Sequence, residues 1–164
     1  YTNSLTKTFT IRPETMASAV ITGCKAKYSY TGKQVKPLIQ VVWNGKILRN
    51  NTDYTLLYKN NKKRGSAGIV VTGKGNYSGT LTASFTIVRA SVKKASVTGL
   101  KAVYARTGKA VKPKVTVKLG GKKLKKKRDY ILSYRKNKKK GTALLYVKGV
   151  GNYSGTKKMK FKIR

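Results

Sequence analysis

Residues 16–88 and 92–164 of this chain repeat one another without a gap at a constant offset of 76 positions. For example, "ITGCKAKYSYTGKQVKP" (21–37) aligns with "VTGLKAVYARTGKAVKP" (97–113), and "GKGNYSGT" (73–80) aligns with "GVGNYSGT" (149–156). Self-similarity at a fixed period is the signature of a repeat architecture, so both copies are expected to share one fold. The opening segment "YTNSLTKTFTI" (1–11) matches only the end of a copy, "YSGTLTASFTI" (77–87). We therefore expect residues 1–12 to be the last strand of an upstream repeat, followed by repeats at 16–90 and 91–164.

Within each copy, apolar and polar residues alternate with the two-residue period of half-buried strands. In "KMKFKI" (158–163) the residues Met159, Phe161 and Ile163 share one face, and three lysines share the other. "NG" at 44–45 and "GG" at 120–121 are hairpin signals, and no segment sustains a helical period. Short strands separated by frequent turns are typical of a β-sandwich. The sequence thus predicts an all-β chain of two tandem β-sandwich repeats of about 76 residues, preceded by the last strand of a third.

The motif series "YTGK-x-VKP", "DY-x-L-x-Y", "G-x-GNYSGT" and "F-x-I" occurs in both copies except that the first becomes "RTGK-x-VKP" in the second. This series resembles the immunoglobulin-like tandem repeats of Gram-positive bacterial surface and secreted proteins. The resemblance covers nearly the whole chain and implies immunoglobulin-like sandwiches that act as non-catalytic stalks or adhesive, wall-associated regions. It also implies a secreted or cell-surface location. The charge departs from that family, whose repeats are closer to balanced, most clearly at "KKKR" (125–128).

The chain carries 39 Lys and Arg, 3 Asp and Glu and no His, for a net charge of +36. Because 39% of its residues are hydrophobic, we expect a packed core and not a disordered polycation. The charge is uneven: residues 16–88 hold 11 basic residues and one acid (+10), whereas 92–164 hold 25 and one (+24). Neutral residues become basic at positions where the strand pattern predicts exposure, as when "RNNT" (49–52) becomes "KKKR". Solubility alone needs a net charge of only about 2–8, so the excess indicates a function.

The function that this charge favours is non-catalytic binding of anionic polymers through many simultaneous lysine contacts. With 31 Lys and 8 Arg, the surface suits sequence-independent attraction to closely spaced anions. The expected partners are sulfated or sialylated glycans, teichoic acids, DNA or RNA bound non-specifically, and anionic membrane surfaces, with an upstream domain of the same protein as a further possibility. The expected binding residues lie in the second copy: Lys122, Lys123, Lys125, Lys126, Lys127, Arg128, Arg135, Lys136, Lys138, Lys139, Lys140, Lys158, Lys160 and Lys162.

Two other interpretations stay open. The copies could be structural spacers that present an upstream functional domain, with the charge serving solubility or retention. The chain could also be an engineered, supercharged scaffold, although the lower charge of the first copy argues against this. A difference between the two copies in their retention on an anionic column would separate binding from a spacer role.

Catalytic and metal sites are not expected. Without His, and with Glu14, Asp53 and Asp129 as its only carboxylates, the chain offers no Ser-His-Asp triad and no carboxylate pair or metal-ligand set within a copy. A Ser–Lys dyad is compatible with the composition, but so many lysines make any such proximity weak support. Asp53 and Asp129 occupy equivalent places before a strand, where a turn-capping role is favoured over catalysis of a Lys–Asn isopeptide crosslink, since the final strands lack Asn. No cofactor is expected.

Three remaining residue types have ordinary structural interpretations. Cys24 aligns with Leu100 and is expected to be a small buried hydrophobic residue, and a single cysteine excludes an internal disulfide. Trp43 is expected to pack within a strand rather than stack on carbohydrate. Asn76 and Asn152 fit glycosylation sequons, but tight turns account for them equally well. We recognise neither a signal peptide nor an apolar run of the ~18–20 residues that cross a bilayer.

Overall fold

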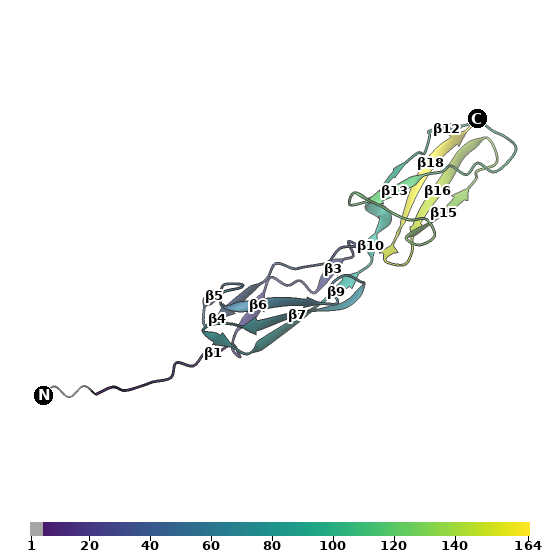
Figure 1. Ribbon diagram of the computed structural model, residues 1–164. Helices are drawn as coiled ribbons and strands as arrows, with labels where there is room; N and C mark the ends of the chain where they lie inside the picture. Colours follow the sequence, from purple (N-terminus) through teal and green to yellow (C-terminus); the bar gives the residue numbers. More distant parts are fainter. Residues whose placement is uncertain (1–4) are drawn as a thin grey trace. The chain divides into compact units, whose positions relative to one another are not determined.

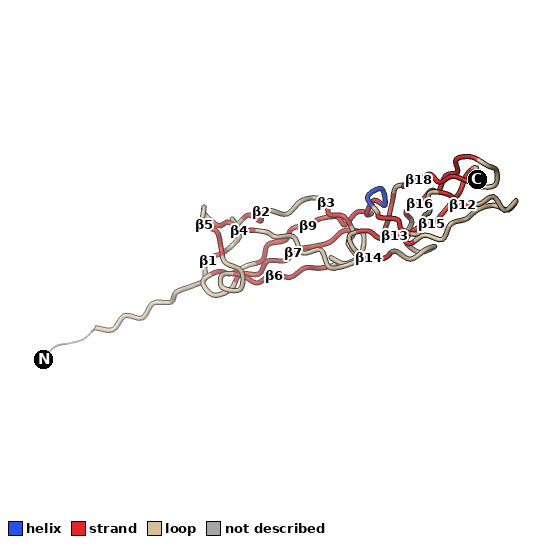
Figure 2. The backbone as a smooth tube through the Cα atoms, turned by 90° about the horizontal axis from the view of Figure 1, so that it is seen from above, coloured by secondary structure: helices blue, strands red, loops and turns tan. Residues whose placement is uncertain are grey.

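The computed structural model describes residues 5–164 as an all-β chain, and strand pairing divides its strands into two groups, β1–β9 and β10–β18 (Figure 1). Several sheets in two sandwich-like groups confirm the predicted fold class. The described residues contain no α-helix; the blue turn in Figure 2 is a short 3-10 helix, Val92–Lys94, whose first turn is capped by the Ser91 hydroxyl. No helix within 5–164 is long and apolar enough to cross a membrane.

The first group contains three sheets. Its four-stranded sheet has the order β3-β9-β7-β6, its three-stranded sheet the order β2-β4-β5, and β1 pairs in parallel with β8. The strands are β1 (Glu14–Thr15), β2 (Val20–Thr22), β3 (Lys27–Ser29), β4 (Gln40–Trp43), β5 (Lys46–Leu48), β6 (Tyr54–Lys59), β7 (Gly65–Gly73), β8 (Tyr77–Ser78) and β9 (Thr80–Val88).

The second group has the same plan: a four-stranded sheet β12-β18-β16-β15, a three-stranded sheet β11-β13-β14 and a parallel pair β10-β17. Each strand begins 76 residues after its counterpart, so the sequence offset is also the structural offset. The strands are β10 (Ala90–Ser91), β11 (Ser96–Thr98), β12 (Val103–Tyr104), β13 (Thr116–Leu119), β14 (Lys122–Lys123), β15 (Tyr130–Arg135), β16 (Gly141–Gly149), β17 (Tyr153–Ser154) and β18 (Thr156–Ile163).

The two predicted hairpin turns are confirmed. Asn44 and Gly45 join β4 to β5 with φ of 46° and 77°, and Gly120 and Gly121 join β13 to β14 with φ of 55° and 75°. Positive φ at both central residues gives the turn whose twist matches that of the flanking strands, and Asn and Gly are the residues that adopt it most readily. These turns fix the register of the hairpins, with Trp43 opposite Lys46 and Leu119 opposite Lys122.

Besides Pro37 and Pro113, ten equivalent positions are buried in both groups, and they form the two cores. Changes among them conserve hydrophobic character and approximate volume, a kind of exchange that cores tolerate well. The pairs are Met16/Val92, Val41/Val117, Leu48/Leu124, Tyr54/Tyr130, Ala67/Ala143, Ile69/Leu145, Val71/Val147, Tyr77/Tyr153, Phe85/Phe161 and Ile87/Ile163. The added charge of the second copy therefore leaves the core pattern of the fold unchanged.

A matching hydrogen bond closes each group on one flank. The hydroxyl of Tyr58 on β6 donates to the carbonyl oxygen of Pro37 at 2.6 Å, and that of Tyr134 on β15 donates to Pro113 at 2.7 Å. Each bond ties the edge strand of the four-stranded sheet to the segment that leads into the other sheet.

Residues 5–13 form no strand and are drawn as loop in Figure 2. Leu5, Phe9 and Ile11 are 86%, 84% and 81% exposed. The segment that the sequence predicts to be a last strand is therefore unpaired over residues 5–12, and its residues 1–4 lie outside the described part of the chain.

Candidate polyanion-binding surface

All fourteen basic residues predicted to bind polyanions are exposed, and they occupy three places in the second group. Lys122–Arg128 lie on β14 and the turn that follows it, Arg135–Lys140 on the end of β15 and the loop to β16, and Lys158, Lys160 and Lys162 on β18. The strand register shows which of these places adjoin one another.

The β18 lysines form a single row on the outer face of the four-stranded sheet. Their inward neighbours Phe161 and Ile163 are 2% and 1% exposed, which confirms the predicted alternation. Side chains two residues apart along a strand are about 7 Å apart, so the row presents evenly spaced ammonium groups.

Beside this row, β16 presents a partly apolar strip. Tyr146 lies opposite Lys158, and Leu144 lies opposite both Lys160 on β18 and Arg135 on β15. The guanidinium carbon of Arg135 is 5.7 Å from the centre of the Tyr146 ring, within the range of a cation–π contact. The sheet face therefore combines a row of cations with an aromatic and aliphatic strip.

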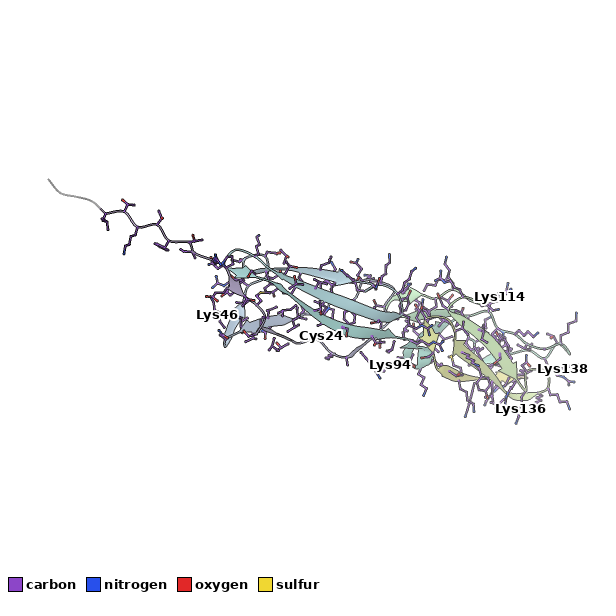
Figure 3. The ribbon with its side chains drawn as sticks, turned by 90° about the horizontal axis from the view of Figure 1, so that it is seen from below. Cys24, Lys46, Lys94, Lys114, Lys136 and Lys138 are labelled. Atoms are coloured by element: carbon purple, nitrogen blue, oxygen red, sulfur yellow. The ribbon has the colours of Figure 1, made fainter. Side chains whose placement is uncertain are left out.

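The loop after β15 extends the lysine row. Gly141 pairs with Ile163 and Thr142 with Lys162, so the loop that ends at Lys140 reaches β16 beside the end of β18. Figure 3 shows Lys136 and Lys138 projecting from the backbone. The loop therefore adjoins the end of the lysine row.

The turn 125–129 lies at the opposite end of β15. The backbone N–H of Val150, beyond the far end of β16, donates to the carbonyl oxygen of Asp129 at 3.0 Å. The structure therefore does not unite all fourteen residues in one patch: Lys122–Arg128 form a second cluster.

A groove of about 830 Å³ runs along this second cluster, and five lysines line it. Leu132 and Tyr134 are half-buried side chains in its wall, together with Tyr130. The five lysines are Lys112, Lys114, Lys123, Lys125 and Lys126. Because β14 and β15 are edge strands of different sheets, the groove follows the open flank of the sandwich.

The sequence prediction missed Lys112 and Lys114. They precede β13 and lie outside the densest charge runs, so only the fold of the strands places them beside Lys123–Lys126. The alternation of Lys112 and Lys114 with the buried Pro113 was the available signal. In the first group the corresponding five residues are Lys36, Leu38, Ile47, Arg49 and Asn50, which carry two positive charges in place of five.

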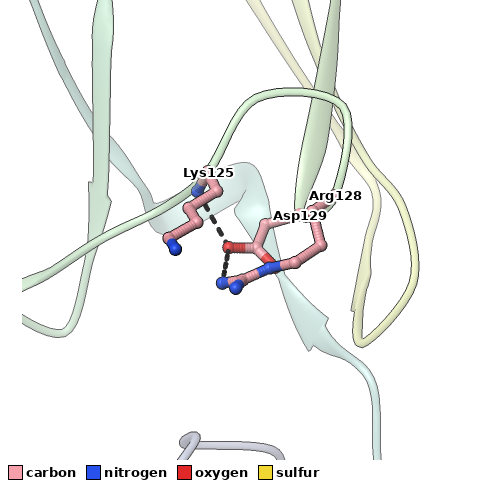
Figure 4. Close-up of polar contacts among 3 residues, drawn as sticks. All are labelled: Lys125, Arg128 and Asp129. Atoms are coloured by element: carbon pink, nitrogen blue, oxygen red, sulfur yellow. Dashed lines mark hydrogen bonds and ion pairs between the residues drawn. The ribbon is translucent and has the colours of Figure 1, made fainter.

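Asp129 caps the turn 125–129 by accepting hydrogen bonds from other residues of the turn. Its Oδ2 accepts the backbone N–H of Lys125 at 2.8 Å, and the Nε and Nη2 of Arg128 donate to its two oxygens at 2.9 and 2.8 Å (Figure 4). These bonds, first of all those from Arg128, hold the pKa of Asp129 below its usual range, although burial opposes the shift. Arg128 is thus engaged by an acid and is less available to a ligand than its lysine neighbours.

In the first group, Asp53 accepts the N–H of Arg49 at 2.7 Å in the same way. The predicted turn-capping role is confirmed for both acids, with the donor four residues earlier in the chain. Such a cap explains why these two acids occur at equivalent positions in a chain with so few others.

Two of the candidate lysines adopt backbone conformations that lysine disfavours. Lys127 has φ of 71° and Lys136 has φ of 54°, and the corresponding residues of the first group, Asn51 and Asn60, have φ of 67° and 55°. Asn adopts the left-handed region readily, whereas for other L-residues it costs about 1–2 kcal/mol. Basic side chains thus stand where the local backbone favours Asn.

The remaining sequence predictions have mixed outcomes. Trp43 packs within the fold, as expected: its Nε1 donates to the Thr15 carbonyl at 3.0 Å and its ring meets Tyr77 edge-on at 5.5 Å. Cys24 is half-buried, so the prediction of a buried residue was wrong. Among residues 5–164 no group of three acidic, His or Cys side chains is placed to hold a metal ion.

Comparisons with protein-family models, with curated proteins and with solved structures find no match to this chain. Its function is therefore inferred from the chain's own residues.

Proposed function

We propose that the second repeat binds anionic polymers by multivalent electrostatic contact, without catalysis. One observation carries the proposal: between two copies of one fold the ten core positions keep their character, while exposed positions change from neutral to basic. Since Lys127 and Lys136 occupy backbone positions that favour Asn, the charge is present at a cost in stability. A surface kept at such a cost supports a role for the charge itself.

In this proposal two surfaces contact the polymer. The β18 row with the loop 136–140 offers a line of exposed lysines to an extended polymer, and the flank groove offers lysines around half-buried Leu132 and Tyr134. Lysine ammonium groups attract sulfate, carboxylate and phosphate alike, so glycans, teichoic acids and nucleic acids are all ligands of this proposal. Neutralising 6–10 anions would weaken binding about 10³–10⁵-fold between 50 and 200 mM salt.

The setting we propose is a secreted or bacterial cell-surface protein with immunoglobulin-like repeats. A spacer role is the second candidate, favoured by the short junction between the copies: β9 ends at Val88 and β10 begins at Ala90, so one residue connects them. If the repeats were only spacers, lysine at positions 127 and 136 would bring no benefit over the Asn that the first copy has there.

The test compares variants of the full chain that each lose three positive charges. The row variant K158T/K160S/K162T and the groove variant K114L/K123I/K126N install the residues that the first copy has at those positions. The matched control K93A/K94S/K118V does the same elsewhere in the second copy. Binding to a labelled heparin oligosaccharide and to labelled duplex DNA is measured by fluorescence anisotropy from 50 to 200 mM NaCl.

We expect the parent chain to bind both probes with steep salt dependence. For DNA, a variant that removes three contacts should flatten the slope of log K against log salt by up to about 2.7, and the control should flatten it less. Failure of the parent chain to bind either probe at 50 mM NaCl would reject the proposed function. Equal losses in all three variants would reject the two surfaces described here as its sites.

A further inference from the structure

We propose that residues 5–11 are the final strand of a further β-sandwich of the same repeat type, which stands immediately ahead in the same polypeptide. This inference is independent of the proposed function. It concerns the exposed apolar segment that neither described repeat uses.

Residues 5–11 have the apolar face and the polar face of a final strand. Leu5, Phe9 and Ile11 have the spacing of Leu81, Phe85 and Ile87 on β9. Phe85 and Ile87 are 2% and 1% exposed, whereas Phe9 and Ile11 are 84% and 81% exposed. The intervening Thr6, Thr8 and Thr10 correspond to Thr82, Ser84 and Thr86, which face solvent. An alternating strand of this kind leaves three large apolar side chains in water unless a core receives them.

Neither described repeat has a place for this strand. A final strand lies inside the four-stranded sheet, with β9 between β3 and β7 and β18 between β12 and β16. Both of those places are already filled by the repeats' own final strands. The receiving sheet must therefore belong to a third sandwich.

The junction indicates that this sandwich precedes residue 14 in the same chain. β9 ends at Val88 and β10 begins at Ala90. At the same offset, Arg12 corresponds to Val88, and Glu14, the first residue of β1, corresponds to Ala90. The spacing in sequence from the end of the final-strand segment to the first strand of the next repeat is thus the same at residues 12–14 as at residues 88–90.

One residue departs from the pattern. Lys7 corresponds to the half-buried Ala83 and Met159 on the inner face of the strand. The structure already holds a lysine two residues before Met159: Lys157 is half-buried, and its Nζ donates to the carbonyl oxygen of Ala95 at 2.6 Å. A long aliphatic stem lets such a side chain cover apolar surface while its charge reaches a partner, so Lys7 is compatible with a final strand.

The first experiment supplies the other strands of the proposed upstream sandwich. A copy of residues 14–76 is placed directly before Tyr1 of the full chain, so that 1–12 follow it as 77–88 follow 14–76. Amide hydrogen exchange of residues 5–11 is then measured by NMR in the extended and parent chains. We expect exchange to slow about 100-fold or more in the extended chain, because strand amides become hydrogen-bonded in a cooperative unit. The variant F9D of the extended chain should lose that protection.

The second experiment tests the strand in an existing sandwich. The variant T80S/A83K/S84T/V88R of the full chain gives β9 the sequence of residues 4–12. We expect it to keep a cooperative transition of the first repeat, followed by Trp43 fluorescence. The control L81T/T82L/F85T/T86F, which turns two apolar side chains outward, should lose that transition. If residues 5–11 of the extended chain exchange as fast as in the parent, or if the grafted β9 unfolds the first repeat, the proposal is wrong.

Discussion

Replacing Lys127 and Lys136 by Asn should stabilise the second repeat, although each change removes a surface side chain and makes no new contact. Both residues have positive φ, and the first repeat has Asn at the same two positions with nearly the same φ. Left-handed backbone costs an ordinary L-residue about 1–2 kcal/mol and costs Asn less, so each substitution should recover roughly 0.5–1 kcal/mol.

The two gains should add. The sites flank β15, whose six residues span about 20 Å, and sites this far apart usually act independently. The double variant should therefore gain about 1–2 kcal/mol, or roughly 4–16 °C in the melting temperature of a repeat of this size. Differential scanning calorimetry of the full chain measures this shift, and Trp43 fluorescence identifies the transition that belongs to the first repeat.

K126N and K138N are the matched controls. Each removes one exposed lysine from the same turn or loop, at a residue whose φ is not positive. If K127N and K136N raise the melting temperature no more than these controls, relief of like-charge repulsion explains the gain. The inference that charge was placed against backbone preference would then be refuted.

Three further predictions concern the charged surface and its supports. The pKa of Asp129 is lowered on folding, so its ionised form stabilises the fold above its ordinary pKa of about 3.9, and this stabilisation is lost as pH falls below that value. In urea titrations, D129N should therefore be less stable than the parent chain at pH 7 by about 1–3 kcal/mol, and it should lose less further stability below pH 4. Raising NaCl from 0.1 to 1 M shortens the screening length from about 10 to 3 Å and so weakens the repulsion between like charges. Calorimetry should show a larger increase in melting temperature for the second repeat than for the first, and an equal increase in both would contradict this. Y134F loses the hydrogen bond to Pro113, so urea unfolding should show a loss of about 1 kcal/mol, and an unchanged midpoint would argue against that bond.

The fold could be predicted largely because the chain contains its own comparison. The 76-residue offset identifies equivalent positions, and the alternation of Met159, Phe161 and Ile163 with lysines sets the inner face of β18. The turn at Asn44-Gly45 follows from the φ values that these residues favour. The alternation and the turn are local signals, so they can be read from neighbouring residues, and the offset then carries them from one copy to the other.

The candidate site was predicted less completely because it depends on which strands adjoin. The charge runs identify Lys122–Arg128, but the groove also needs Lys112 and Lys114, which come beside that cluster only through the sandwich flank. Likewise, the engagement of Arg128 by the buried Asp129 follows from the path of the turn. The strained backbone at Lys127 had a usable signal, since its counterpart Asn51 is a residue that tolerates positive φ.

The most direct test of polyanion binding follows the unfolding of each repeat in the full chain while a polyanion is added. A ligand at 100 times its dissociation constant stabilises the repeat that binds it by about 2.7 kcal/mol. With heparin at this excess in 100 mM NaCl, we predict a raised melting temperature for the second repeat and a much smaller shift in the transition reported by Trp43. Equal shifts in both repeats, or none in the second, would contradict the proposal that the second repeat is the binding module.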